Sequence, residues 1–171
     1  GLVTLGIPPT GPETGYGYIL AGEAVAAHPA ARRCDRFTEK PDRTTAERFV
    51  ADGRYYWNSG IFLWQAATLL KAVAQHLPEH WRALEEIRPA LGTPGEAEVL
   101  DRVFPRMPRV SVDVGILERA HDVYMIPATF GWDDVGAWSA LGRILPQDDS
   151  GNAVVGRHTG RDSHGCVVYA T

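Results

Sequence analysis

The sequence has 171 residues, the size of one ordinary globular domain. Apolar residues make up 44% and charged residues 22%, close to the composition of folded domains, which excludes wholesale disorder. The 17 basic residues stand against 21 acidic ones, a net charge of −4 without a run of like charge. We therefore expect no nucleic-acid partner and no membrane contact, and no stretch approaches the roughly 20 apolar residues of a membrane-spanning helix.

The N-terminal part of the chain is predicted to alternate strands with loops. A loop rich in Gly, Pro and Thr covers residues 10–15, and Asp42 stands where the N-cap of a short helix over 44–50 belongs, with Gly53 closing that helix. The β-rich segments that we expect as strands are residues 2–7, 16–20 and 33–38.

The middle of the chain is predicted to hold two further strands, over 55–57 and 60–64, and then a helical region over 66–104. Leu69, Leu70, Val73 and Leu77 lie on one apolar stripe, and we expect Leu69, Val73 and Leu77 in the core. Residues 76–80 match the H-x-x-E-H string of one zinc-protease class. Because Pro78 breaks a continuous helix, we expect two helices there and no zinc site.

The C-terminal part continues the alternation of helices and strands. We expect a short helix over 96–104, an extended segment over 110–113, a helix over 115–120, a strand over 123–126 and a helix ending at 145. Beyond Pro146 the residues change to Gly, Asp, Ser and His, which predicts a linker before a last strand over 166–169. The alternation indicates an α/β fold.

The cysteine and lysine content adds two constraints. Cys34 and Cys166 are the only cysteines and form no C-x-x-C, so we expect neither a disulfide framework nor a zinc knuckle, and a cytoplasmic location. Only Lys40 and Lys71 are lysines among the 17 basic residues. The chain also opens on Gly1 rather than Met, and we expect it to be a piece of a longer protein.

Glu39 and Lys40 close a predicted strand, and ligands of open α/β sheets bind at the carboxyl ends of strands. An ammonium suits a phosphate, and a neighbouring carboxylate can accept hydrogen bonds from sugar hydroxyls. The alternative is a surface ion pair without function. Asn58 and Ser59 interrupt an apolar run, so a neighbour, a water or a ligand must satisfy their polar groups.

Two further segments leave two interpretations open. Asp133 and Asp134 follow Trp132 in a Gly-flanked turn, where they can bind Mg²⁺ with help from a second acid elsewhere, or cap the helix that follows. The glycines of residues 13–18 can let the backbone approach a ligand, or simply form a turn into a strand.

Four of these segments, taken in order and at their spacings, resemble the mannose-1-phosphate guanylyltransferases, a branch of the sugar nucleotidylyltransferases. The likeness runs from about residue 1 to residue 145, through residues 13–19, 37–42, 57–62 and 131–138. It implies a Rossmann-like α/β domain with a mixed sheet and flanking helices. Residues 1–147 would be its sugar-phosphate-binding half, and residues 148–171 a linker and the start of a small β-structured tail.

The resemblance also implies roles for single residues. Lys40 would hold the phosphate of mannose 1-phosphate, and Glu39 would bind the sugar hydroxyls. Asn58 and Ser59 would line the sugar pocket, and the backbone at Gly17 would touch the sugar.

For the metal, the resemblance implies that Asp134 is one of two Mg²⁺ ligands and, with Lys40, a catalytic residue. Asp133 would stand behind it without binding the metal, and Ala137 replaces the serine usual in the family. The triphosphate loop, the base-selecting residues and the second metal ligand are expected N-terminal to residue 1, so the isolated chain should be almost inactive.

The implied reaction joins mannose 1-phosphate to GTP with Mg²⁺, giving GDP-mannose and pyrophosphate, and the family allows a homodimer. Two alternatives remain at this point. The chain can be a sugar-phosphate-binding or interaction module without catalysis, or the nucleotidylyltransferase of another sugar 1-phosphate.

Overall fold

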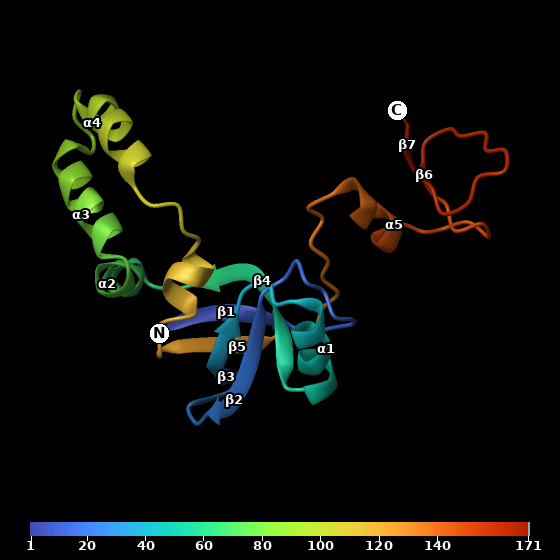
Figure 1. Cartoon of the computed structure of the whole chain (residues 1–171), viewed down its shortest axis with the longest axis horizontal. Coiled ribbons are helices and arrows are strands. Elements are labelled where there is room, and N and C mark those ends of the chain that lie inside the picture. Colours follow the sequence, from blue (N-terminus) through green and yellow to red (C-terminus); the bar gives the residue numbers. More distant parts are fainter. Residues whose placement is uncertain (171) are drawn as a thin grey trace. The chain divides into compact units, whose positions relative to one another are not determined.

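The computed structural model describes residues 1–170, which form two compact units. The first unit comprises Gly1–Thr129, and the second begins at Phe130. The predicted functional division after residue 147 stays a prediction, because compactness does not say which residues bind a ligand. Figure 1 labels the α-helices and β-strands of both units.

A five-stranded sheet forms the first unit. Its strands are β1 (Leu2–Ile7), β2 (Tyr18–Val25), β3 (His28–Thr38), β4 (Tyr55–Leu63) and β5 (Val123–Pro127). They pair in the order β1-β4-β2-β3-β5, and β5 also pairs with β1, so the sheet closes on itself. The β1–β5 pair is parallel and the other pairs are antiparallel, so the sheet is mixed.

Two strand predictions need correction. Strands β2 and β3 form a long hairpin that reaches Val25 and His28, well beyond the predicted segments 16–20 and 33–38. Strand β4 is continuous, whereas the sequence predicted a break at Asn58 and Ser59. The pairing of β4 with β1 shifts register here and Gly60 has a φ of 71°, so a bulge accommodates the polar residues within one strand.

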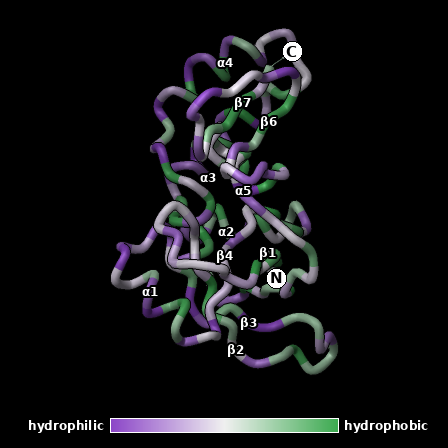
Figure 2. Tube along the Cα trace, turned by 90° about the vertical axis from the view of Figure 1, so that its right-hand side faces the viewer, coloured by the Kyte–Doolittle hydropathy of each residue, from purple (hydrophilic) through white to green (hydrophobic). Residues whose placement is uncertain are grey.

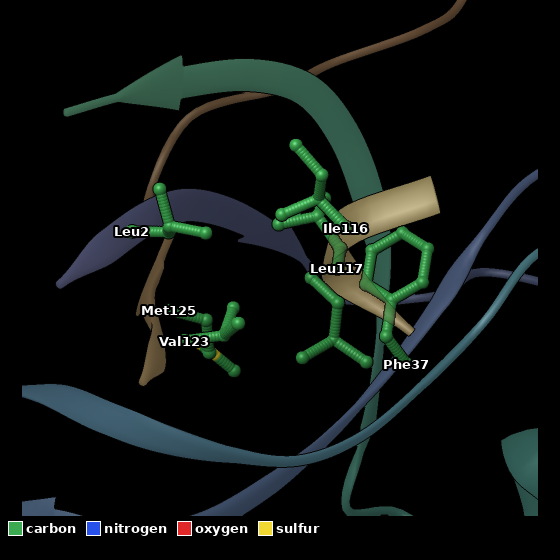
Figure 3. Close-up of a cluster of buried hydrophobic side chains, with 7 residues drawn as sticks. Leu2, Phe37, Ile116, Leu117, Val123 and Met125 are labelled. Atoms are coloured by element: carbon green, nitrogen blue, oxygen red, sulfur yellow. The ribbon is translucent and has the colours of Figure 1, made fainter. Parts of the chain in front are cut away.

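The core of the first unit lies between the sheet and a short helix near residue 115. Figure 3 shows Phe37 of β3 beside Ile116 and Leu117, with Leu2, Val123 and Met125 from β1 and β5. Helix α2 (Ala66–His76) packs on this cluster through residues of the predicted stripe, namely Leu69 and Val73, with Leu77 following the helix. Hydrophobic residues are prominent in β1 and α2 (Figure 2).

The predicted helical region consists of α2 followed by α3 (Pro78–Ile87) and α4 (Glu96–Val103), with one-turn helices η1 (Arg88–Ala90) and η2 (Phe104–Arg106). Pro78 starts α3, as predicted, so the H-x-x-E-H string spans two helices. Within residues 1–170 there is no group of three or more His, Cys, Asp or Glu side chains arranged for a metal ion. No helix in this range is long and apolar enough to cross a bilayer.

Helix α1 (Arg43–Asp52) begins and ends where the sequence predicts. The Thr45 amide donates to Oδ1 of the N-cap Asp42 at 2.7 Å, and Gly53 takes the left-handed conformation at the C-terminus. Thr45 hydrogen bonds lower the pKa of Asp42. A carboxyl group whose folded pKa is depressed stabilises the fold above its unfolded pKa, and this contribution is lost as the pH falls through the folded pKa.

We therefore expect Asp42→Ala to lower the melting temperature at pH 7, and the difference from wild type to shrink as the solution is acidified below about pH 4. Circular dichroism melts across this pH range measure both quantities. Asp101→Ala, at an exposed position of α4, is the control. A difference independent of pH would show that the Asp42 carboxylate does not act as the cap.

Residues 110–120 depart from the prediction. Residues Asp113–Leu117 form a π-helix, η3, where the sequence predicted an extended segment up to residue 113 and a helix only from 115. Gly115, Ile116 and Leu117 are buried, so contact with the core determines this conformation. π-Helices are rare and occur frequently at functional sites.

The second unit contains η4 (Trp138–Ala140), α5 (Leu141–Ile144) and two short parallel strands, β6 (Ala153–Val155) and β7 (Val167–Tyr169). Strand β6 was not predicted, because its three residues lie within a stretch of turn-forming residues. Asn152, which precedes β6, is buried, and its side chain bonds to Asp148 and to the backbone of Ser163 and Cys166. Residues after 147 thus include a pair of short strands, and their assignment to a separate tail stays a prediction.

Candidate functional site

Glu39 and Lys40 follow the end of β3, as the sequence indicated. Lys40 Nζ donates to Glu39 Oε1 at 3.0 Å. The lysine side chain is 64% exposed and the glutamate side chain 16% exposed, so the ammonium faces solvent while the carboxylate lies mostly inside. Lys40 has a φ of 48°, in the left-handed region that non-glycine residues rarely adopt, and such strained backbone concentrates at functional sites.

The second carboxylate oxygen of Glu39 is buried. Among residues 1–170, Glu39 Oε2 has no hydrogen-bond partner. Gly17 leaves the space beside this oxygen, since a Cβ there would lie 2.5 Å from Glu39 Oε2 and 3.3 Å from Asn58 Cβ. A buried acceptor without a donor costs about 1–3 kcal/mol, which a ligand hydroxyl would relieve.

We expect Gly17→Ala to destabilise the first unit by about 1–3 kcal/mol, because the added methyl group has to displace the Glu39 carboxylate while it also lies only 3.2 Å from Phe37 Cζ and 3.3 Å from Asn58 Cβ. Urea unfolding measures this effect. Gly15→Ala is the matched control two residues earlier, because nothing lies within 4 Å of a Cβ at Gly15. Equal stabilities of the two variants would contradict the close packing of Gly17 against Glu39.

Asn58 is held by several partners. Its backbone amide donates to Gly17 O at 2.8 Å, which joins β4 to the glycine-containing residues 13–18. Its side-chain Oδ1 accepts from Thr4 Oγ1 at 2.9 Å, and its Nδ2 donates to Asp113 Oδ1 at 3.1 Å. The hydroxyl of neighbouring Ser59 accepts from the amide of Ile61 at 3.1 Å, so it helps to stabilise the bulge.

The electrostatics of the site favour a charged ammonium. The hydrogen bond from Lys40 to Glu39 raises the pKa of Lys40, and the charges of Glu39 and Asp113 raise it further. Because Lys40 is largely exposed, its ion pair adds little to stability. The arrangement is an exposed cation beside a mostly buried carboxylate and the Asn58 amide, which fits a ligand with a phosphate and hydroxyls.

The structure thus brings Gly17, Glu39, Lys40 and Asn58 together, with Ser59 next to them in β4. Sequence reasoning missed three residues of this cluster: Thr4, Asp113 and Glu118. The Glu118 carboxylate accepts from the Glu39 backbone amide at 2.9 Å. Asp113 and Glu118 flank the apolar core residues of η3, and acids on both sides of a short apolar run were the only available signal.

Asp133 and Asp134 lie in the second unit. Arg143 holds Asp133 through two hydrogen bonds of 2.8 Å, which lower the pKa of Asp133. The helical turn that follows has Ala137 as its N-cap without a side-chain hydrogen bond, so neither aspartate caps it. The helix-capping alternative is therefore wrong.

The arrangement fits Asp134 as a single metal ligand. Asp134 is exposed, whereas the carboxylate of its neighbour Asp133 accepts hydrogen bonds from Arg143. Mg²⁺ commonly takes one or two carboxylates together with substrate phosphates and waters, so one protein oxygen from this unit is compatible with such a site.

Comparison with known proteins gives the family. A family model for nucleotidyl transferases matches residues 1–150. The chain belongs to this family. It is 41% identical over 153 residues to the xanthan biosynthesis protein XanB of Xanthomonas campestris, covering 89% of this chain and 32% of the relative. It is 38% identical over 170 residues to mannose-1-phosphate guanylyltransferase of Klebsiella pneumoniae, covering 98% and 36%.

The alginate biosynthesis protein AlgA of Pseudomonas aeruginosa is 35% identical, with 98% of this chain and 35% of the relative covered. The chain therefore spans about a third of the length of these curated relatives.

A solved structure described as mannose-1-phosphate geranyltransferase from Thermus thermophilus superposes with a TM-score of 0.82 at 41% identity. It covers 99% of this chain and 48% of that one. A structure described as mannose-6-phosphate isomerase from Helicobacter pylori superposes with a TM-score of 0.63 at 25% identity, covering 78% and 51%. These likenesses confirm the predicted fold class, a Rossmann-like α/β nucleotidyltransferase with a mixed sheet.

Proposed function

We propose that this chain supplies the sugar-phosphate site of a mannose-1-phosphate guanylyltransferase. The reaction transfers a guanylyl group from GTP to mannose 1-phosphate and gives GDP-mannose and pyrophosphate. The family and the relative named mannose-1-phosphate guanylyltransferase support transfer of a nucleotidyl group to a sugar phosphate. The choice of mannose and of GTP is the finer part of the proposal.

One observation carries the proposal: the two oxygens of Glu39 serve different purposes. Oε1 accepts from Lys40, whereas Oε2 is buried beside Gly17 and has no partner among residues 1–170. A sugar 1-phosphate satisfies both groups at once, because a ring hydroxyl can donate to Oε2 while the phosphate meets the exposed ammonium. A surface ion pair without function would not need the buried, unpartnered oxygen.

In the proposed reaction, a phosphate oxygen of the sugar 1-phosphate forms a bond to the α-phosphorus of GTP as the bond to pyrophosphate breaks. Both reactants are anions, so positioning and charge neutralisation provide most of the catalysis. Lys40 would hold the attacking phosphate and reduce its repulsion from the triphosphate. Glu39, Asn58 and Ser59, with the backbone at Gly17, would fix the sugar so that this oxygen points at phosphorus.

For the metal, we propose Asp134 as a Mg²⁺ ligand, with Asp133 kept apart from it by Arg143. Bound Mg²⁺ would neutralise phosphate charge in this reaction. We also propose a cytoplasmic location, since the free thiols of Cys34 and Cys166 suit a reducing compartment.

Isothermal titration calorimetry of the chain tests the sugar-phosphate site. Mannose 1-phosphate should bind, and mannose, which lacks the phosphate, should give no measurable heat at the same concentrations. Glucose 1-phosphate tests the choice of sugar. Binding of mannose and mannose 1-phosphate with equal affinity would contradict a phosphate role for Lys40, and absence of any binding by mannose 1-phosphate would contradict the proposed site.

Turnover separates an enzyme from a binding module. In the Klebsiella pneumoniae relative, this chain would replace the matching 170 residues, and pyrophosphate release would be followed with GTP and mannose 1-phosphate. We expect turnover with this pair of substrates. A folded chimaera that binds mannose 1-phosphate without releasing pyrophosphate would favour the non-catalytic alternative.

A further inference from the structure

The π-helix η3 (Asp113–Leu117) and the residue that follows it, Glu118, contact the candidate site. Asp113 bonds to Asn58 of β4, and Glu118 bonds to Glu39 after β3. The buried residues Ile116 and Leu117 of η3 belong to the same core cluster as Phe37, which lies two residues before Glu39 (Figure 3). Acidic residues stand at both ends of this buried segment: Asp113 is its first residue, and Glu118 follows its last. Packing of η3 in the core therefore fixes the positions of the Asp113 and Glu118 carboxylates relative to the end of β3.

Asp113 sets the orientation of the Asn58 amide. Asn58 Oδ1 accepts from Thr4 Oγ1 at 2.9 Å and from the Gly60 amide at 3.3 Å, while Nδ2 donates to Asp113 Oδ1 at 3.1 Å. If the amide were flipped, its oxygen would face the Asp113 carboxylate and its NH₂ group would face the Gly60 donor. The Thr4 hydroxyl can donate or accept, but the Gly60 amide can only donate and the Asp113 carboxylate accepts, so these two partners favour the observed orientation.

Glu118 sets the position of the Glu39–Lys40 turn. Its Oε1 accepts from the Glu39 backbone amide at 2.9 Å, immediately after β3 ends. On the other side of the turn, the Lys40 amide donates to Tyr16 O at 3.3 Å. The left-handed conformation of Lys40 is therefore held from two directions, by Glu118, which follows η3, and by the carbonyl of Tyr16.

We propose that Asp113 and Glu118 are positioning residues of the sugar-phosphate site, and that Asp113 makes Asn58 a hydrogen-bond donor toward the sugar. This inference rests on the proposed function. With Oδ1 engaged by Thr4 and Gly60, the remaining Nδ2 hydrogen is what the Asn58 amide offers a ligand, while Glu39 Oε2 offers an acceptor. The site would then recognise two sugar hydroxyls: one donates to Glu39 Oε2, and the other accepts from Asn58 Nδ2.

Variants at position 113 separate the hydrogen bond from the charge. Asp113→Leu removes the acceptor, and we expect the dissociation constant for mannose 1-phosphate to rise about 3- to 10-fold. Asp113→Asn keeps an acceptor oxygen for Asn58 Nδ2 without the charge, so it should recover most of this affinity. Asp101→Leu, at an exposed position of α4, should bind like the wild type.

An exchange of the two side chains tests the donor role of Asn58. In the double variant Asn58→Asp with Asp113→Asn, the new amide can donate to the new carboxylate, so the pair is restored with reversed polarity. The site then has no amide donor at position 58, and we expect the affinity for mannose 1-phosphate to fall at least about 10-fold, although the variant should unfold at a urea concentration close to that of the wild type.

Calorimetry with mannose 1-phosphate gives the affinities, and ¹H–¹⁵N spectra report changes in the hydrogen bonding of the Asn58 side-chain amide. The proposal expects the Asn58 amide signals to shift in Asp113→Leu and to return toward their wild-type positions in Asp113→Asn. If the wild-type chain binds mannose 1-phosphate and Asp113→Leu binds equally well, the positioning role of Asp113 is wrong and the proposed function stands. If the wild-type chain does not bind, the proposed function fails and the positioning role fails with it.

The role of Glu118 is tested in the same assay. Glu118→Leu removes the acceptor for the Glu39 amide, and we expect weaker binding of mannose 1-phosphate, again about 3- to 10-fold. Glu118→Gln keeps an acceptor oxygen and should recover most of the affinity. Equal affinities for Glu118→Leu and the wild type would overturn this half of the proposal.

Discussion

Replacing Lys40 with alanine should raise the KM for mannose 1-phosphate about 10- to 150-fold in the chimaera with the Klebsiella pneumoniae relative. A charge-assisted hydrogen bond to a phosphate contributes about 1.5–3 kcal/mol, and this range of KM follows from its loss. Alanine carries the same left-handed backbone penalty as lysine, so folding should change little. The KM for GTP should stay the same, because Lys40 is assigned to the sugar phosphate.

Lys71→Ala is the matched control for this experiment. Lys71 is the only other lysine of the chain and lies in α2, away from the end of β3. Steady-state kinetics of pyrophosphate release give both constants for each variant. Equal KM values for mannose 1-phosphate in Lys40→Ala and Lys71→Ala would contradict the role of Lys40. A rise confined to the KM for GTP would show that Lys40 interacts with the nucleotide and not with the sugar phosphate.

The second large effect concerns stability. Ile116 is 2% exposed and lies in the core cluster between η3 and the sheet (Figure 3). Ile116→Ala should lower the free energy of unfolding by about 2–5 kcal/mol, because it removes buried methyl groups and leaves a cavity. Since η3 also carries Asp113, we expect binding of mannose 1-phosphate to weaken in the fraction that remains folded.

Val114→Ala is the control within the same π-helix. Val114 is 36% exposed, so its truncation should change the free energy of unfolding by about 0.5 kcal/mol or less. Urea unfolding followed by circular dichroism measures both variants. If Ile116→Ala were no less stable than Val114→Ala, the core contact that holds η3 in place would not exist in solution.

Local signals in the sequence located much of the fold. Asp42 and Gly53 mark the ends of α1 because capping depends on neighbouring residues alone. Pro78 separates α2 from α3 for the same reason, since a proline lacks the amide hydrogen that a continuous helix needs.

Features set by tertiary contacts were not predictable in this way. The bulge that keeps β4 continuous depends on pairing with β1, and the π-helix depends on burial of Ile116 and Leu117. The short strand β6 depends on its pairing with β7, in which Ala153 lies opposite Val167, fourteen residues later in the chain.

The residues of the candidate site also fall into two groups, those marked by local sequence and those brought in by tertiary contacts. Glu39, Lys40, Asn58 and Gly17 stand in segments whose order resembles a known family, and the structure places these four together. Asp113 and Glu118 reach the site only because η3 packs beneath β3, at sequence separations of 55 residues from Asn58 and 79 residues from Glu39. No local pattern encodes such contacts.

Because the chain has only two lysines, contact between Lys40 and a sugar phosphate can be observed directly. The chain would be labelled with ¹³C-lysine, which gives side-chain signals from Lys40 and Lys71 alone, and titrated with mannose 1-phosphate and with mannose. We expect mannose 1-phosphate to shift the Lys40 signal with saturation and to leave the Lys71 signal unchanged, and we expect mannose to shift neither signal. A Lys40 signal that stays in place at all concentrations of mannose 1-phosphate would show that Lys40 does not contact the sugar phosphate.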